Sequence, residues 1–193
     1  AVTMVTAANV VDPTPPNCRT CHKIHDTYTD ADYDITYTDP AMYWNDNTIS
    51  HDLGEGNICA NCHQARVLSP VADPVTMDSV TLTSNRWGYH HGPQYNMVIG
   101  EGGYRTAGGN YATPAASHKN MVADGCVECH MGPAFGNAAG GHTWFMVYEY
   151  HGSETDNVAA CESCHPGESD FDINGVQTEI QFLLDSLQGK LLT

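Results

Sequence analysis

The pattern of apolar and polar residues predicts few strands, all of them short. Residues 33–38 (YDITYT) alternate as a half-buried strand does, and so do parts of 74–83 (PVTMDSVTLT). Residues 144–150 (WFMVYEY) form a continuous strand-like run. Turn residues rich in glycine and proline separate these segments, so we expect mostly loops and short elements.

The C-terminal segment has a different pattern. Ile180, Leu183, Leu184 and Leu187 recur at intervals of three and four, which places them on one face of a helix. We therefore predict a closing amphipathic helix over residues 176–191.

The segment just before this helix has two interpretations. Asp170-Phe-Asp-Ile-Asn-Gly175 matches the first half of a calcium-binding loop, but the twelfth position is Gln181 and not Glu. Loss of the bidentate carboxylate favours an Asx-rich turn that caps the helix over a calcium site.

The composition offers little material for a hydrophobic core. The 193 residues include only four Phe, against 18 glycines and 10 prolines. The length allows one ordinary domain or two small ones. We expect a single domain over residues 1–193, with 1–17 as an N-terminal extension, in which something other than side chains fills the interior.

The charge excludes some functions. Asp and Glu number 23 against 7 Lys and Arg, a net charge of −16, which repels nucleic acid and anionic lipid. No apolar run approaches the roughly 20 residues of a membrane-spanning helix. The start, AVTMVTAANVVDP, lacks the charged and apolar regions of a signal peptide and reads as a mature N-terminus after cleavage.

Every cysteine belongs to a C-x-x-C pair followed at once by histidine, in the motifs CRTCH, CANCH, CVECH and CESCH. Two thiols three residues apart lie on one side of a helical turn, where both can add to the vinyl groups of one porphyrin. The adjacent histidine then stands under the iron, so the motif is the attachment signature of haem c. The residues predicted to hold four covalent haems are Cys18, Cys21 and His22; Cys59, Cys62 and His63; Cys126, Cys129 and His130; and Cys161, Cys164 and His165.

Other uses of cysteine pairs explain less. Zinc sites and redox dithiols also use C-x-x-C, and cysteines can form disulfides, but none of these predicts histidine after all four pairs. Thioether bonds would consume every thiol, so we expect no disulfides. The predicted fold class is a multihaem cytochrome c, mostly loops with short helices and few short strands wrapped around four stacked haems.

Each iron needs a second axial ligand unless one site stays open. Methionine could serve, but the excess of histidine in a chain poor in other basic residues favours ligation by two histidines. The candidate distal ligands are His25, His51, His90, His91, His118 and His142, with His151 the weakest.

His25 lies three residues after His22, so on a helix both side chains would start from the same face of the first haem. A distal ligand approaches from the opposite face. His25 therefore serves a different haem, in this chain or in another subunit, or is a solvated surface residue.

The other candidates lie in suggestive contexts. His51 and His118 each precede a motif by eight residues, with glycine in between, which suggests one structural device used twice. In it the upstream histidine turns away from the following motif and reaches a neighbouring haem. His142 follows two glycines that let the backbone approach a flat ring. Of the adjacent His90 and His91, we expect one ligand.

CRTCHKIH, HDLGEGNICANCHQAR, HHGPQ, GCVECHM followed by GGHTW, and CESCH resemble the multihaem c-type cytochromes of metal-reducing bacteria. Over residues 18–190 the chain is most similar to the tetrahaem outer-surface cytochrome E type, whose subunits polymerise into extracellular filaments. The resemblance implies a head-to-tail homopolymer at the outer cell surface or beyond it, with redox partner proteins and external electron acceptors. It also implies that one haem per subunit takes its distal ligand from the next subunit, a position that suits His25.

The predicted function is electron transfer and not catalysis, because six-coordinate iron leaves no site for a substrate. Two alternatives stay open. A soluble periplasmic tetrahaem shuttle would use His25 within its own chain. A multihaem reductase would need one five-coordinate haem beside an acid or arginine, and beyond Arg19 the chain offers only Arg66, Arg86 and Arg105.

Overall fold

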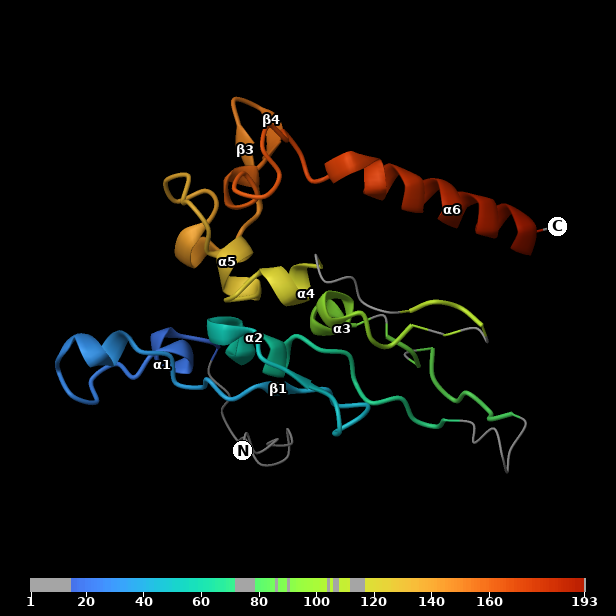
Figure 1. Ribbon diagram of the computed structural model, residues 1–193, viewed down its shortest axis with the longest axis horizontal. Helices are drawn as coiled ribbons and strands as arrows, with labels where there is room; N and C mark the ends of the chain where they lie inside the picture. The colour runs from blue at the N-terminus through green and yellow to red at the C-terminus, as the bar shows by residue number, and fades with distance from the viewer. Residues whose placement is uncertain are drawn as a thin grey trace. The chain divides into compact units, whose positions relative to one another are not determined.

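The computed structural model describes residues 15–71, 79–85, 87–89, 91–103, 105, 108–111 and 117–192. Contacts between Cα atoms divide the chain into two units, which meet in sequence at Asp39 and Pro40. Apart from α6 (Val176–Leu191), the described elements are short helices and, in the second unit, short strands, joined by irregular chain (Figure 1), as the sequence predicts. A single domain built around haems stays a prediction.

The first unit contains the first cysteine motif. It consists of α1 (Cys18–Cys21) and the 3-10 helix η2 (Asp30–Tyr33). A capping box starts α1: the Asn17 side chain accepts the Arg19 N–H at 3.0 Å, and the Thr20 hydroxyl accepts the Asn17 N–H at 3.0 Å.

The strand predicted over 33–38 is wrong. Tyr33 ends η2, and the described residues of this segment make only one isolated bridge, between Ile35 and His22. Ile35 and Tyr37 are half-buried while their neighbours are exposed, so the alternation marks one-sided burial of an extended segment without a ladder.

The second unit contains the other three motifs. Its elements are β1 (Ala41–Met42), β2 (Ser50–His51), η3 (Gly54–Gly56), α2 (Asn57–Cys62), α3 (Gln94–Ile99), α4 (His118–Met121), α5 (Cys126–His130), η4 (Gly141–Thr143), β3 (Val147–Tyr150), β4 (Ser153–Asp156), η5 (Val158–Ala160), η6 (Ile173–Gly175) and α6 (Val176–Leu191). The strands form two antiparallel pairs, β1 with β2 and β3 with β4.

The strand predictions in this unit have mixed outcomes. The strand predicted over 144–150 begins only at Val147, because Trp144 adopts a left-handed backbone with φ 58° that a strand cannot contain. Of the strand predicted within 74–83, residues 79–83 form no strand, and the remainder lies outside the described residues.

Buried side chains gather around the second motif. The core consists of Ala41, Tyr43, Leu53, Ala60, Tyr95 and Ile99, contributed by β1, α2, α3 and the loops between them. The buried Tyr95 hydroxyl donates to the Ala41 carbonyl at 2.6 Å, which joins α3 to β1. So small a core agrees with the composition.

The predicted C-terminal helix is confirmed as α6, drawn in red in Figure 1. The Asp172 side chain accepts the N–H groups of Gln177 and Thr178 at 2.7 and 3.2 Å, so the predicted cap is also confirmed. The helix does not close the chain on itself, because its apolar side chains, Leu183 and Leu187 among them, remain about half exposed.

Candidate functional site

Each cysteine motif forms one helical turn. The backbone N–H groups of His22, His63 and His165 donate to the carbonyl of the first cysteine in their own motif, each at 2.8 Å. In the third motif α5 runs through all five residues, Cys126–His130. The two cysteines of each motif are therefore three residues apart on one turn, as the attachment of a single porphyrin requires.

The pKa values of three cysteines argue against a redox dithiol. Burial raises the pKa of the Cys126, Cys129 and Cys161 thiols, whereas redox dithiols have lowered pKa values. All eight cysteines lie in the described part of the chain, where none forms a disulfide. Among the described residues no three His, Cys, Asp or Glu side chains are grouped as ligands of a metal ion.

Two of the histidines predicted to be proximal ligands are held by backbone carbonyls. The Tyr33 carbonyl lies 2.6 Å from His22 Nδ1, and the Trp144 carbonyl lies 3.1 Å from His130 Nδ1. A carbonyl can only accept, so we assign the proton of each ring to Nδ1 and the lone pair to Nε2. Histidines that ligate metals are oriented in this way, so these two residues fit haem iron.

Sequence reasoning missed Tyr33 and Trp144 because they act through backbone carbonyls, which leave no residue signature. The left-handed Trp144 ends η4 and turns the chain back under α5. The pair of glycines before His142 is the one sequence signal near this turn. Gly140 lies tight against the Pro133 carbonyl, where an added Cβ would come within 2.5 Å.

The second and third motifs pack directly against each other. A Cβ on Gly56 would lie 2.8 Å from the Asp124 carbonyl oxygen and 2.8 Å from the Cys126 nitrogen. A Cβ on Gly125 would lie 2.8 Å from the Leu53 Cβ. The glycines permit this close approach of two backbones, each at the start of a motif.

The predicted device shared by His51 and His118 is wrong in its local structure. His51 lies on strand β2, whereas His118 begins helix α4. The segments after His51 and His118 both contain glycine because they pack against each other through Gly56 and Gly125. They do not adopt the same conformation.

The third and fourth motifs are also in contact. A Cβ on Gly132, two residues after His130, would lie 2.6 Å from the Ala160 Cβ, just before Cys161. The buried Asn157 donates to the Pro133 carbonyl at 3.1 Å. The second, third and fourth motifs thus follow one another in space in the order of the sequence.

The structure brings one distal candidate against a proximal histidine. The rings of His118 and His165 have centroids 6.1 Å apart, with planes at 88° to each other. His118 thus reaches the fourth motif and not the third, which it precedes, in agreement with the predicted direction.

The remaining distal candidates of the second unit differ in burial. His51 is half-buried. This burial lowers its pKa, and the positive charge of Lys119 lowers it further. The ring is therefore neutral at pH 7, as a metal ligand must be. His142 is exposed in η4 and His91 is exposed before α3. His90 lies outside the described residues.

His22 and His25 do not lie on one helix, contrary to the geometry expected from their spacing. Helix α1 ends at Cys21, His22 is extended, and His25 has a left-handed backbone with φ 65°. The ring of His25 is exposed and lies 5.5 Å, between centroids, from that of Tyr28, which is also left-handed. Whether His25 serves another haem stays a prediction.

Asp32, which the sequence did not single out, holds this strained loop. Its carboxylate accepts the N–H groups of His25, Thr27 and Tyr28 at 2.9, 2.7 and 3.0 Å, and the Thr27 hydroxyl at 2.7 Å. The Thr27 hydroxyl in particular lowers the pKa of Asp32. Left-handed backbone at residues other than glycine persists only where neighbours enforce it, so Asp32 fixes the exposed position of His25.

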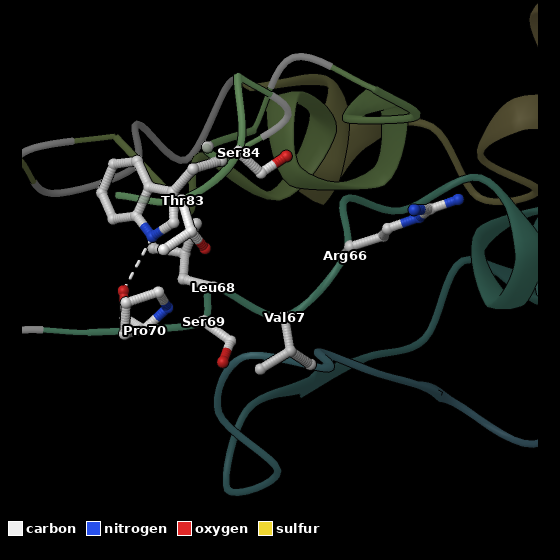
Figure 2. Close-up of a pocket in the computed structure, with 9 residues that line it drawn as sticks. Arg66, Val67, Leu68, Ser69, Pro70, Thr83 and Ser84 are labelled. Atoms are coloured by element: carbon white, nitrogen blue, oxygen red, sulfur yellow. Dashed lines mark hydrogen bonds between the residues drawn. The ribbon is translucent and has the colours of Figure 1, made fainter. Parts of the chain in front are cut away.

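One pocket lies apart from these groups. Figure 2 shows it between residues 66–70 on one side and residues 83, 84, 87 and 88 on the other. A hydrogen bond from the Trp87 indole to the Pro70 carbonyl, at 2.7 Å, joins the two sides. Arg66 stands at its rim and points away from Leu68 and Pro70 (Figure 2). The described lining contains no histidine, cysteine or carboxylate, so the pocket is no part of the candidate haem sites.

Comparisons with protein families, curated proteins and solved structures found no match to this chain. In the described part of the chain, none of the helices has the length and apolar content needed to cross a membrane.

Proposed function

We propose that the chain carries four covalent haems c and transfers electrons between them. The observation that carries the proposal is the conformation of the motifs: each C-x-x-C-H is one helical turn, and carbonyls orient His22 and His130 for ligation. The haem iron supplies the redox chemistry by cycling between its ferric and ferrous states.

The chain's own residues attach, orient and order these groups. Each cysteine thiol adds across one vinyl group, its sulfur bonding one carbon and its proton passing to the other. The Tyr33 and Trp144 carbonyls keep the Nδ1 protons in place. The glycine contacts at Gly56 and Gly132 bring the second, third and fourth attachment turns into series, which supports electron transfer along the chain.

The chain is further proposed to be a subunit of an extracellular filament, as in the cytochromes that its motifs resemble. Head-to-tail contacts that do not close generate an open polymer. The exposed loop that displays His25, held by Asp32, supports a role for this residue as an axial ligand in the next subunit. The net charge of −16 would keep such filaments apart.

Electron microscopy and absorption spectroscopy of native protein beside His25→Ala test this function. We expect filaments and only low-spin haem in the native sample, and monomers with one high-spin haem in the variant. Asp26→Asn is the matched control, since Asp26 is next to His25, is also exposed and is not a ligand candidate. Haem-loaded monomers in every sample would favour the periplasmic shuttle, and a high-spin haem in the native protein would favour a reductase.

A further inference from the structure

The rings of His118 and His165 meet although 47 positions separate them, and they belong to different motifs. His165 follows Cys164 and is proximal in the fourth motif, while His118 begins α4, ahead of the third. Among the described residues, His118 is the histidine whose ring lies against His165. The chain between them passes through the third motif and the β3–β4 hairpin.

The ring separation matches two ligands on opposite sides of one metal ion. A histidine nitrogen lies about 2.0 Å from a bound metal, and a five-membered ring with bonds near 1.33 Å has its centroid about 1.1 Å from each atom. Two opposed imidazoles on one iron therefore have centroids about 6.2 Å apart. The observed distance is 6.1 Å.

The centroids of two rings in a plain edge contact also lie about 4.5–7 Å apart, so the distance alone does not identify a shared metal ion. The chemistry of the fourth motif supplies a second argument. A haem attached through Cys161 and Cys164 would have His165 on one side of its iron, and a six-coordinate iron would need a second ligand on the other side. His118 approaches that motif because the third and fourth motifs are tied together at Gly132 and Asn157.

We propose that His118 and His165 are the two axial ligands of the haem attached to the fourth motif, with their imidazole planes nearly perpendicular. This assignment rests on the proposed function and names one ligand pair within it. It makes His118 a ligand inside the chain, so the fourth haem needs no residue from another subunit.

The perpendicular planes have a spectroscopic consequence. The ring planes set how the two ligands divide their π-bonding between the iron d orbitals. Perpendicular rings leave these orbitals nearly equal in energy, which gives a strongly anisotropic low-spin EPR signal. Parallel rings split the orbitals and give a more compact spectrum. The interplanar angle of 88° assigns the first kind of signal to the fourth haem.

The test uses the haem-loaded full chain and three substitutions. In His118→Ala we expect one haem in four to become high-spin, with loss of the anisotropic EPR signal and recovery of low-spin haem on addition of imidazole. In His118→Met, which keeps a ligand, the potential of one haem should rise. Glu149→Gln, exposed on β3 and not a ligand candidate, should leave all four haems low-spin.

A background lacking the fourth haem identifies which iron is affected. In Cys161→Ser/Cys164→Ser protein, adding His118→Ala should create no new high-spin haem. A new high-spin haem in that background would show that His118 serves another iron and would overturn the assignment. Four low-spin haems in His118→Ala would overturn it as well. Native protein without covalent haem would instead refute the proposed function, which keeps the two failures distinct.

Discussion

The contact between the second and third motifs predicts that Gly56→Ala destabilises the protein. Gly56 has φ −67°, so alanine fits the backbone there and would by itself be favourable. Its Cβ, however, would lie 2.8 Å from two backbone atoms, where ordinary contacts begin at 3.4 Å. The two segments must separate by roughly 0.6 Å, and overpacking of this kind costs about 1–3 kcal/mol.

For a chain of this size, each 1 kcal/mol lowers the melting temperature by about 2–4 °C, so we expect a fall of about 2–12 °C. Thermal unfolding of the haem-loaded protein, followed by circular dichroism, measures it. Gly189→Ala is the matched control: Gly189 lies within α6 with nothing inside 4 Å of an added Cβ, so alanine should raise stability slightly. A melting temperature for Gly56→Ala equal to or above that of the native protein would refute the close contact between motifs.

Two carboxylates offer further tests. Asp32→Asn removes an acceptor oxygen from the loop that displays His25, so filaments should become shorter or fewer in micrographs. The control is Asp30→Asn, on the same 3-10 helix. An equal effect of both substitutions would contradict the role of Asp32. Hydrogen bonds to the Asp172 carboxylate lower its pKa from the usual 3.8, and the bond from the Thr178 hydroxyl has the largest effect. Because the pKa is lower in the folded state, ionised Asp172 stabilises the fold fully above pH 3.8, and this stabilisation is lost as pH falls through the folded pKa. The helicity of α6, measured by circular dichroism, should therefore drop only below about pH 4. Asp172→Asn should flatten that dependence, and an unchanged curve would refute the cap.

Local patterns were predictable from the sequence where local chemistry alone decides the structure. The helix over 176–191 and its Asx cap follow from spacing and from one aspartate, and both are confirmed. The helical turn at each motif follows from the i, i+3 placement of the cysteines. The strand over 33–38 failed because alternation reports one-sided burial and does not require a partner strand.

The relations between motifs were not predictable, because they depend on tertiary packing. The spacing of His118 predicts a haem other than the third but does not say which neighbour, and only the folded chain places its ring against His165. The role of Asp32 was hidden because acidic residues are abundant, and its three backbone partners appear only after the loop turns left-handed at His25. The sequence shows a glycine before each of the second and third motifs, Gly56 and Gly125. That these glycines let the two motifs pack together becomes evident only when both backbones are placed in the fold.

The central claim is that all four motifs carry covalent haem. Intact-mass spectrometry of the denatured, reduced protein, combined with a pyridine haemochrome assay, tests it most directly. The account predicts four haems per chain that resist acidic acetone, no thiol open to alkylation, and three haems in Cys161→Ser/Cys164→Ser. A chain whose eight cysteines all react with an alkylating reagent, or whose haem is extracted by acid, would contradict it.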